Sequence, residues 1–270
     1  MAKEPVSHDR NFDDLAKRFQ KNIYGGLKGD IRLAVLDRDF REFFPSKPFG
    51  NDTQKTLNIL DAGGGQGQFS LQFAKAGHNV IICDISIEML KLAEKEVAAY
   101  QLKDRVTLIH CAIQDLPQHV PQGESRFDVV LCHAVMEWVV NPPELLDVLM
   151  KYLNKEGFLS LTFYNLHSLI YKNLLRTNFK KIQQKDFGGA RGSLTPINPL
   201  YPEQVFEWLK TLPLKVLATS GIRVFHDYIF NEEHREREPE NVIDLELEFS
   251  RKQPYQLLGR YIHVLAKRLV

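Results

Sequence analysis

The chain has 270 residues, of which 44% are hydrophobic and 26% charged, a composition typical of a soluble globular protein with one large α/β domain or two small ones. Its net charge of +1 excludes a global field that attracts nucleic acid, so such a partner would need a local basic patch. The polar start MAKEPVSHDR and the absence of any apolar run near the ~18 residues of a membrane span lead us to expect a cytoplasmic protein without membrane contact.

Residues 1–55 begin with a helical, mixed-charge stretch and close on the turn-rich FFPSKPFGND (43–52). We expect this segment to form an N-terminal helical cap. Five short apolar runs follow, and their nearly continuous apolar character is typical of parallel strands buried on both faces. The predicted strands are TLNILDA (56–62), HNVIICDI (78–85), RVTLIHCAI (105–113), FDVVLCHAV (127–135) and GFLSLTFYN (157–165).

Helical patterns separate these strands. Residues 87–97 carry apolar side chains at helical spacing behind a predicted N-cap at Ser86. Another helix is expected to begin at Asn141-Pro142-Pro143, an N-cap followed by proline where no amide donor is needed. The βαβ order predicts right-handed crossovers and a doubly wound, Rossmann-like α/β sheet.

Residues 166–200 interrupt the alternation with a basic stretch, whose only acid is Asp186 and whose local charge is +5. A helix over 201–212 and two final strands follow, KVLATSGIRVFHDY (215–228) and LGRYIHVLAKR (258–268). The acidic NEEHREREPENVIDLELE (231–248) lies between those strands. The basic residues of 166–200 are Lys172, Arg176, Lys180, Lys181, Lys185 and Arg191.

These elements predict a single domain over residues 1–270, with a seven-stranded mixed sheet and helices on both faces. Its expected parts are the helical cap at 1–55, a cofactor-binding core at 56–165, a basic substrate insertion at 166–200, and a C-terminal helix with the final strand pair at 201–270.

The three cysteines, Cys83, Cys111 and Cys132, end strand-like runs without any CxxC pair, so we interpret them as reduced thiols. His110 precedes Cys111, and His133 follows Cys132. Because adjacent strand residues point to opposite faces, neither dipeptide is expected to hold one ion. Without zinc-type spacing or a carboxylate cluster, the sequence predicts no metal site.

A glycine cluster follows the first predicted strand. Gly63, Gly65 and Gly67 give G-x-G-x-G, whereas a dinucleotide loop requires a third glycine at position 68, which is glutamine. The spacing resembles the nucleotide loop of class I S-adenosylmethionine methyltransferases. Asp84 ends the second strand, where an acid binds ribose hydroxyls in nucleoside-binding folds. We expect a nucleoside cofactor; a dehydrogenase and a purely structural turn are the disfavoured alternatives.

The absence of two sequence motifs narrows the set of atoms that could accept the methyl group. No cysteine stands in a recognisable motif for covalent activation of uracil C5. After the fourth strand, CHAVMEW replaces the Asn/Asp-Pro-Pro-aromatic motif of base amino methyltransferases, while Asn141-Pro142-Pro143 comes later and is followed by Glu144. Hydroxyl and carboxylate oxygen remain.

A hydroxyl acceptor would need a base, for which His133 is the candidate. A carboxylate, with a pKa of ~4, is already ionised and needs only cations and hydrogen-bond donors to hold it. Donors of this kind fall on or beside the last three strands; they are Tyr164, Asn165, Arg223, Tyr228, Arg260 and Tyr261. A surface arginine or half-buried tyrosine is the ordinary alternative for any one of them.

Several motifs together resemble one family, the tRNA 5-carboxymethoxyuridine methyltransferases, from about Asp9 to the C-terminus. They are DRNFDDLAKRFQKNIYGGLKGDIR, LDAGGGQGQ, CDIS, IHCAIQD, HAVMEWV, FYN, GIRVFHDY and LGRYIHV. The resemblance implies a class I fold, S-adenosyl-L-methionine as cofactor, and esterification of the carboxylate of the modified wobble uridine in a tRNA anticodon stem-loop. It implies no acid–base residue, so catalysis would rest on proximity and orientation.

The same resemblance implies a cofactor-binding set, which includes Gly65 of the glycine loop. Arg32 would pair with the cofactor's methionine carboxylate, Asp61 would orient its amino end, and His133 would face its methionine side. Gly63 and Gly64 would lie beneath it, Asp84 and Ile85 would hold ribose and adenine, and Ile113 and Gln114 would meet the adenine ring.

The basic insertion, with Phe179 and Phe187, is a candidate RNA contact, and an ordinary solvated loop is its alternative. Four basic residues of the N-terminal segment are candidates for the same RNA-binding surface; they are Lys17, Arg18, Lys21 and Lys28. A small acidic or hydroxylated metabolite in place of RNA, and a cofactor-binding scaffold without activity, are the other functions left open. No obligate protein partner is indicated.

Overall fold

The computed structural model describes residues 9–14, 16, 25–44, 55–120, 127–189 and 195–270. Its centre is a seven-stranded sheet with the order β3-β2-β1-β4-β5-β7-β6, in which β7 is antiparallel to both neighbours and the other pairs are parallel. The predicted seven-stranded mixed sheet is therefore confirmed. The strands are β1 (Asn58–Ala62), β2 (Asn79–Asp84), β3 (Val106–His110), β4 (Phe127–His133), β5 (Leu153–Tyr164), β6 (Leu214–Ile222) and β7 (Tyr261–Arg268).

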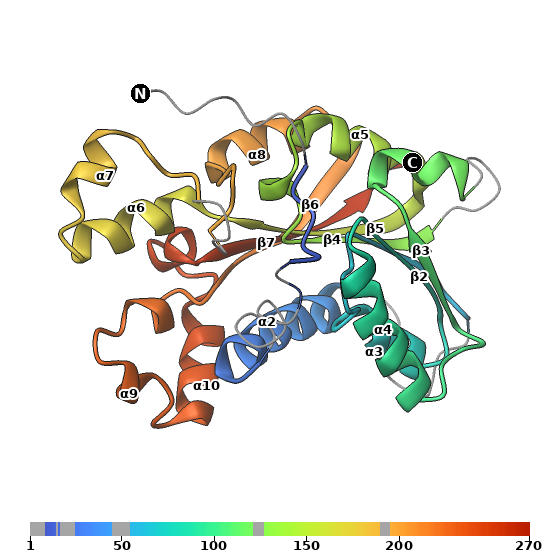
Figure 1. Cartoon of the computed structure of the whole chain (residues 1–270), viewed down its shortest axis with the longest axis horizontal. Helices are drawn as coiled ribbons and strands as arrows, with labels where there is room; N and C mark the ends of the chain where they lie inside the picture. The colour runs from blue at the N-terminus through green and yellow to red at the C-terminus, as the bar shows by residue number, and fades with distance from the viewer. Residues whose placement is uncertain (1–8, 15, 17–24, 45–54, 121–126, 190–194) are drawn as a thin grey trace.

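Helices cover both faces of the sheet, with α2, α3, α4 and α10 on one face and α5 and α8 on the other (Figure 1). Alternate residues of β4 supply two cores: Val129 and Leu131 pack toward α2, α3 and α4, and Val130 and Cys132 pack toward α5 and α8. The helices are α2 (Leu27–Phe43), α3 (Ser70–Lys75), α4 (Ile87–Ala99), α5 (Pro142–Tyr152), α6 (Leu166–Leu175), α7 (Phe179–Gln183), α8 (Pro202–Lys210), α9 (Glu232–Arg235) and α10 (Pro239–Phe249). None of the helices in these described ranges is long and apolar enough to cross a bilayer.

Two predicted helix starts are found where the sequence places them. Ser86 Oγ accepts a hydrogen bond from Met89 N at 3.2 Å and caps α4. The helix α5 begins at Pro142, but Asn141 does not cap its backbone; its Nδ2 donates to Glu144 Oε2 instead, at 3.1 Å. Proline at the first position, which needs no donor, is thus the stronger signal there.

Several predicted strands have an end that is wrong by three residues or more, including the last, which begins at Tyr261 and not at residue 258. The strand expected over 105–113 ends at His110, and a 3₁₀ helix, η2 (Ile113–Gln118), follows. The strand expected over 215–228 ends at Ile222, because Arg223 adopts a left-handed backbone with φ 60°. The strand expected to begin at residue 157 begins at Leu153.

The basic stretch forms α6 and α7, which Figure 1 places at one end of the molecule, far from α4. Phe179 is exposed, whereas Phe187 packs partly buried against the cluster that contains Tyr164 and Tyr261. Arg191, Lys17, Arg18, Lys21 and most of FFPSKPFGND lie outside the described residues.

Helix α10, within the acidic segment, holds the turn that follows β6. The carboxylate of Glu246 is fully buried and accepts hydrogen bonds from Val224 N at 2.6 Å, Phe225 N at 3.1 Å and His226 N at 2.8 Å. These three donors would otherwise be buried without partners. The carboxylate therefore fixes the backbone beside Arg223.

We expect Glu246→Ala to lower the free energy of unfolding by roughly 3 kcal/mol, because buried amides lose a charged acceptor. Urea denaturation measures the loss. Glu248→Ala on the same helix removes an exposed ion pair with Lys252 and should cost less than about 0.5 kcal/mol. Equal losses in the two variants would contradict the role given to Glu246.

Candidate active site

A pocket opens at the carboxyl ends of the central parallel strands, where α/β folds place their ligands. It holds about 670 Å³ of space that no atom fills. Of the residues predicted to bind a cofactor, the pocket brings together Gly63, Gly65, Asp84, Ile85, Ile113, Gln114 and His133. Its other walls are Asp9, Arg10, Phe12, Met89, Ala112, Ala134, Val135, Trp138 and Val139.

The glycine loop forms the floor of this pocket. Gly63 has φ 71° and Gly65 has φ 57°, conformations that favour glycine. A Cβ on Gly63 would lie 2.5 Å from Val135 Cγ2, and a Cβ on Gly65 would lie 2.7 Å from Met89 Cε. A side chain at Gly63 would clash with the branched Val135, and at Gly65 the left-handed backbone itself disfavours a side chain. Both positions therefore keep a bare backbone that can approach a ligand closely.

Asp84 joins the glycine loop to α4. Its Oδ2 accepts from Gly65 N at 2.8 Å and its Oδ1 accepts from Ser86 N at 2.7 Å. Burial raises the pKa of Asp84, although these two backbone donors oppose the rise. The carboxylate is thereby held at the pocket wall in a fixed orientation.

Asp61 lies beneath the loop and is not among the residues that line the pocket. It is 4% exposed, and a Cβ on Gly64 would lie 2.4 Å from its Cγ. Burial raises the pKa of Asp61 to about 7, and the charge of Asp84 adds to the rise. Gly64 therefore leaves space for the Asp61 carboxyl below the loop.

A short N-terminal segment crosses the pocket and is tied to three loops. Arg10 N donates to Trp138 O at 3.0 Å, and Asn11 Nδ2 donates to Ile85 O at 3.2 Å. Asp9 accepts from Val140 N and from Gln114 Nε2, both at 2.9 Å. Residues 9–12 thus cover the pocket. The sequence had indicated these residues only as part of a helical cap.

Next to the pocket lies a buried cluster of three arginines, Arg32, Arg223 and Arg260, each at most 6% exposed. Arg32 and Arg223 lie over the ring of Tyr261, at 4.7 Å and 5.6 Å from its centroid. Arg260 Nη1 donates to Tyr164 Oη at 2.8 Å. We call Arg32, Arg223, Arg260, Tyr164 and Tyr261 the arginine cluster.

One ionised carboxylate faces the arginine cluster. Asp227 Oδ2 lies 2.7 Å from Arg260 Nε and 3.7 Å from Arg223 Nη2. Burial alone would raise the pKa of Asp227, but Arg223, His226 and Arg260 hold it well below its usual range. No residue in the described part of the chain hydrogen-bonds the buried Nε of Arg223.

Glu137 is a second buried carboxyl of this region, and sequence reasoning missed it. Its side chain is 0% exposed, and neither of its carboxyl oxygens has a hydrogen-bond partner among the described residues. Burial raises its pKa to about 8, although the nearby backbone amides of Glu137 and Tyr164 and the charge of Arg32 oppose the rise. Burial therefore favours the protonated form of Glu137, and Asp227 is the ionised carboxylate that faces Arg223 and Arg260.

Two of the predicted substrate residues have hydrogen-bond partners within the fold. Asn165 Nδ2 donates to Leu257 O at 2.7 Å and Gly259 O at 2.8 Å, and its side chain caps α6. Tyr228 Oη bonds Ser168 Oγ at 2.7 Å and Leu258 O at 2.6 Å. Both residues hold the elements around the arginine cluster together.

A smaller basic pocket lies beyond Asp227, toward the surface of α6. Lys172, Arg176 and Arg235 bring three cations to it. Burial lowers the pKa of Lys172 to about 8, and Arg260 contributes to the decrease. Phe230 lines the same pocket and is 75% exposed.

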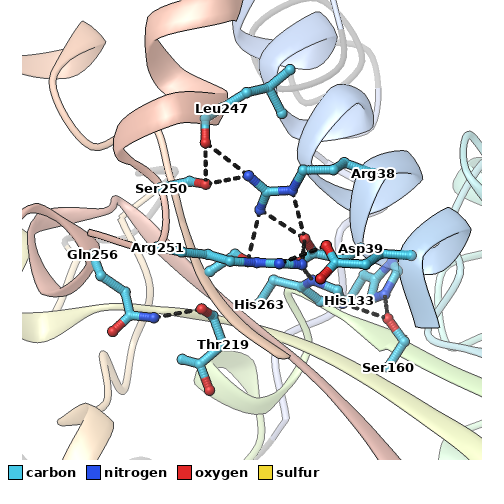
Figure 2. A network of polar contacts seen from close by, with 12 residues as sticks. Arg38, Asp39, His133, Ser160, Thr219, Leu247, Ser250, Arg251, Gln256 and His263 are labelled. Carbon is cyan, nitrogen blue, oxygen red and sulfur yellow. Dashed lines mark hydrogen bonds and ion pairs between the residues drawn. The ribbon is translucent and has the colours of Figure 1, made fainter. Parts of the chain in front are cut away.

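His133, on the pocket wall, begins a chain of buried hydrogen bonds that runs over the neighbouring strands β4, β5 and β7 to helix α2 (Figure 2). Its Nε2 lies 2.8 Å from Ser160 Oγ, which lies 2.9 Å from His263 Nε2. His263 Nδ1 lies 2.7 Å from Asp39 Oδ2. Burial lowers the pKa of His133 well below 6.5, and the charge of Arg32 adds to the decrease, so its ring is neutral.

Comparison with known proteins places the chain in a class and then in a family. Residues 53–210 match the methyltransferase domain family, so the protein is a methyltransferase. Over 265 residues it is 41% identical to the tRNA 5-carboxymethoxyuridine methyltransferase of Escherichia coli (strain K12), with 96% of this chain and 97% of that protein covered. The chain belongs to the tRNA 5-carboxymethoxyuridine methyltransferase family.

More distant similarities agree on the fold. The chain is 31% identical to the malonyl-[acyl-carrier protein] O-methyltransferase of Halalkalibacterium halodurans, over 40% of this chain and 42% of that one. The plantazolicin methyltransferase BpumL, solved with a desmethylPZN analog and SAH, superposes with a TM-score of 0.56 at 16% identity, covering 94% of this chain and 90% of BpumL. The class I methyltransferase fold expected from the glycine loop is thus confirmed.

The buried Glu137 carboxyl predicts a loss of stability as pH rises. In the unfolded chain this group releases its proton near 4.5, whereas in the folded protein it keeps it up to about 8. Between these values the folded state binds more protons, so its stability falls with rising pH. Relative to Glu137→Gln, we expect the wild type to lose about 2 kcal/mol or more between pH 5 and 8. Parallel urea-denaturation curves across that range would contradict the assignment.

Proposed function

We propose that the protein transfers the methyl group of S-adenosyl-L-methionine to the carboxylate of 5-carboxymethoxyuridine at the wobble position of tRNA, and that it acts in the cytoplasm. The observation that carries this proposal is the arginine cluster. Within it, the buried Arg223 and Arg260 share the single negative charge of Asp227, and the buried Nε of Arg223 lacks a partner among the described residues. A buried excess of positive charge is stabilised by an incoming anion.

The pocket residues fit the cofactor. Gly63 and Gly65 leave a cradle that side chains would fill, and Asp84 presents an oriented carboxylate to a ribose. Ile85, Ile113 and Gln114 would flank the adenine. Arg32 and His133 would meet the methionine part, with Asp61 and Gly64 supporting the loop from below. When bound, S-adenosylmethionine supplies an electrophilic methyl group on a sulfonium.

The electrostatics of the site favour a carboxylate acceptor over a hydroxyl acceptor. A hydroxyl needs a base, and His133 is a weak one because its pKa lies well below 6.5. A carboxylate arrives already ionised and must only be held in line. Arg223 and Arg260, with Tyr164, are the donors that would hold it, while Asn165 and Tyr228 would fix the surrounding loops. No residue is assigned a proton-transfer role.

Methyl transfer to purified tRNA tests the proposal directly. We expect labelled methyl from S-adenosylmethionine to enter tRNA that carries 5-carboxymethoxyuridine and not tRNA that lacks it. The product nucleoside should lose its label in mild alkali, because an ester hydrolyses there and an ether does not. Alkali-stable label would indicate a different acceptor atom. Label that enters a small acid, or no acceptor at all, would favour the metabolite enzyme or the inactive scaffold.

We expect Arg223→Ala to lower kcat/KM for tRNA methylation by about 10- to 100-fold, the value of a charge-assisted hydrogen bond. Cofactor affinity, measured by calorimetry, should change less than about threefold, since Arg223 does not line the cofactor pocket. Arg237→Ala removes an exposed arginine between α9 and α10 and serves as the control. Normal methylation by Arg223→Ala would exclude Arg223 as the carboxylate anchor.

We also propose that residues 166–200 form the substrate insertion and contact the anticodon stem-loop. The exposed Lys180 and Lys185 and the half-buried Lys181, on and beside α7, support this role together with the exposed ring of Phe179. The basic pocket around Lys172 would continue the contact toward the arginine cluster.

Replacing Lys180, Lys181 and Lys185 together with alanine should weaken binding of an anticodon stem-loop RNA and flatten its salt dependence, because fewer counterions are released. Cofactor affinity should not change. The matched control replaces Lys91, Lys95 and Lys103, three exposed lysines on and after α4. Fluorescence anisotropy across a salt series measures both slopes. An unchanged slope in the first triple variant would refute the contact.

A further inference from the structure

We propose that Asp39 and His263 are positioning residues that, through Ser160, fix the tautomer of His133 so that its Nδ1 faces the cofactor pocket as a hydrogen-bond acceptor. The inference rests on the proposed function only in taking S-adenosylmethionine as the ligand of that pocket. It assigns a role to two residues that lie outside the pocket wall.

The chain of bonds starts from a carboxylate that is always ionised. Asp39 is fully buried, and its Oδ1 accepts from Arg38 Nε at 2.9 Å, from Arg38 Nη2 at 2.7 Å and from Arg251 Nη2 at 2.6 Å. Burial alone would raise its pKa, but the hydrogen bond from His263 and the charge of Arg38 lower it strongly. An ionised carboxylate only accepts, so His263 Nδ1 must carry the proton that it shares with Asp39 Oδ2.

Charge balance keeps His263 neutral. Asp39 and Glu42 already face the guanidinium groups of Arg38 and Arg251, two negative charges against two positive ones. His263 is 0% exposed, so an imidazolium there would add an unbalanced buried charge. A neutral His263 with a proton on Nδ1 has a lone pair on Nε2.

The remaining directions follow from the single proton of a serine hydroxyl. Ser160 must donate to His263 Nε2, so Ser160 Oγ can only accept from His133 Nε2. His133 Nε2 therefore carries the proton of the neutral ring. Its Nδ1 is left as a lone pair, and His133 is a residue of the pocket wall. That lone pair is suited to an N–H donor, such as the ammonium group of the cofactor's methionine part.

The substitution Asp39→Asn should reverse every bond of the chain. Three arginine donor atoms converge on Oδ1, so the oxygen of the new amide stays with them and its NH₂ group faces His263. His263 Nδ1 then accepts, His263 Nε2 donates to Ser160, and Ser160 donates to His133 Nε2. The proton of His133 moves to Nδ1, and an acceptor in the pocket becomes a donor.

Histidine-selective ¹⁵N NMR reads the tautomer directly, with the His133 signal assigned from the spectrum of His133→Gln. We expect wild-type His133 to carry its proton on Nε2 and Asp39→Asn to shift it to Nδ1. Calorimetry with S-adenosylmethionine should show roughly 10- to 100-fold weaker binding to Asp39→Asn. Asp37→Asn, which removes only an exposed pair with Arg41 on the same helix, should change neither readout.

A wild-type His133 with its proton on Nδ1 would overturn the inference, as would a folded Asp39→Asn variant with an unchanged tautomer. If Asp39→Asn does not fold, Ser160→Ala replaces it, because it removes the hydroxyl and leaves all charges in place. Mixed His133 tautomers and about threefold to tenfold weaker cofactor binding are expected there, and an unchanged tautomer would overturn the inference. The NMR readout needs no methyl transfer, so an inactive wild type with the expected tautomer would refute the proposed function alone.

Discussion

The arrangement of the site depends on the contact between helix α2 and strand β7. Arg32 and Asp39 lie seven residues apart, on one face of the helix, and Tyr261 and His263 lie two residues apart, on one face of the strand. Arg32 lies over the ring of Tyr261, and Asp39 bonds His263. The hydrogen bond between Asp39 and His263 fixes the position of α2 along β7. It therefore also fixes the position of Arg32 beside the pocket. A helix packed only by apolar side chains would leave that position less defined, because hydrophobic contact is not directional.

The buried charges divide into two groups with different consequences. Around Asp39, carboxylates and guanidinium groups balance, so this group is suited to hold the helix and needs no ligand. Around Arg223 they do not balance, because Asp227 is ionised while burial keeps Glu137 mostly protonated. Burying two guanidinium groups that share a single carboxylate is costly to a folded protein. A structure that tolerates this cost beside a ligand pocket is expected to recover it when an anion binds.

The sequence predicts the parallel sheet and the glycine loop well and the buried polar contacts poorly, for a physical reason. The parallel strands, the glycine loop and Asp84 are encoded by residues close together in the chain, so spacing alone locates them. Asp39 and His263 are 224 positions apart, and in the sequence each resembles an ordinary polar residue of an amphipathic element. Glu246 lies in an acidic segment whose composition is typical of solvent-exposed surface, yet its carboxylate accepts hydrogen bonds from three backbone amides. The left-handed turn at Arg223 depends on that distant carboxylate, which is why the strand prediction ran past it.

This division also explains why the general family identifies the chemistry but not the acceptor. The methyltransferase domain match spans residues 53–210, which contain the glycine loop, Asp84 and His133. Arg32, Asp39, Arg223, Arg260 and His263 all lie outside that range. BpumL superposes over 94% of this chain at 16% identity, so a shared fold does not require shared side chains. In our proposal the core range binds the sulfonium nucleoside, and the two flanking segments, joined by the contact of α2 with β7, supply the cations that select an anionic acceptor. Methyltransferases of this fold can then differ in their acceptor through changes in the two flanking segments, because those segments position the cations while the core keeps the methyl donor in place.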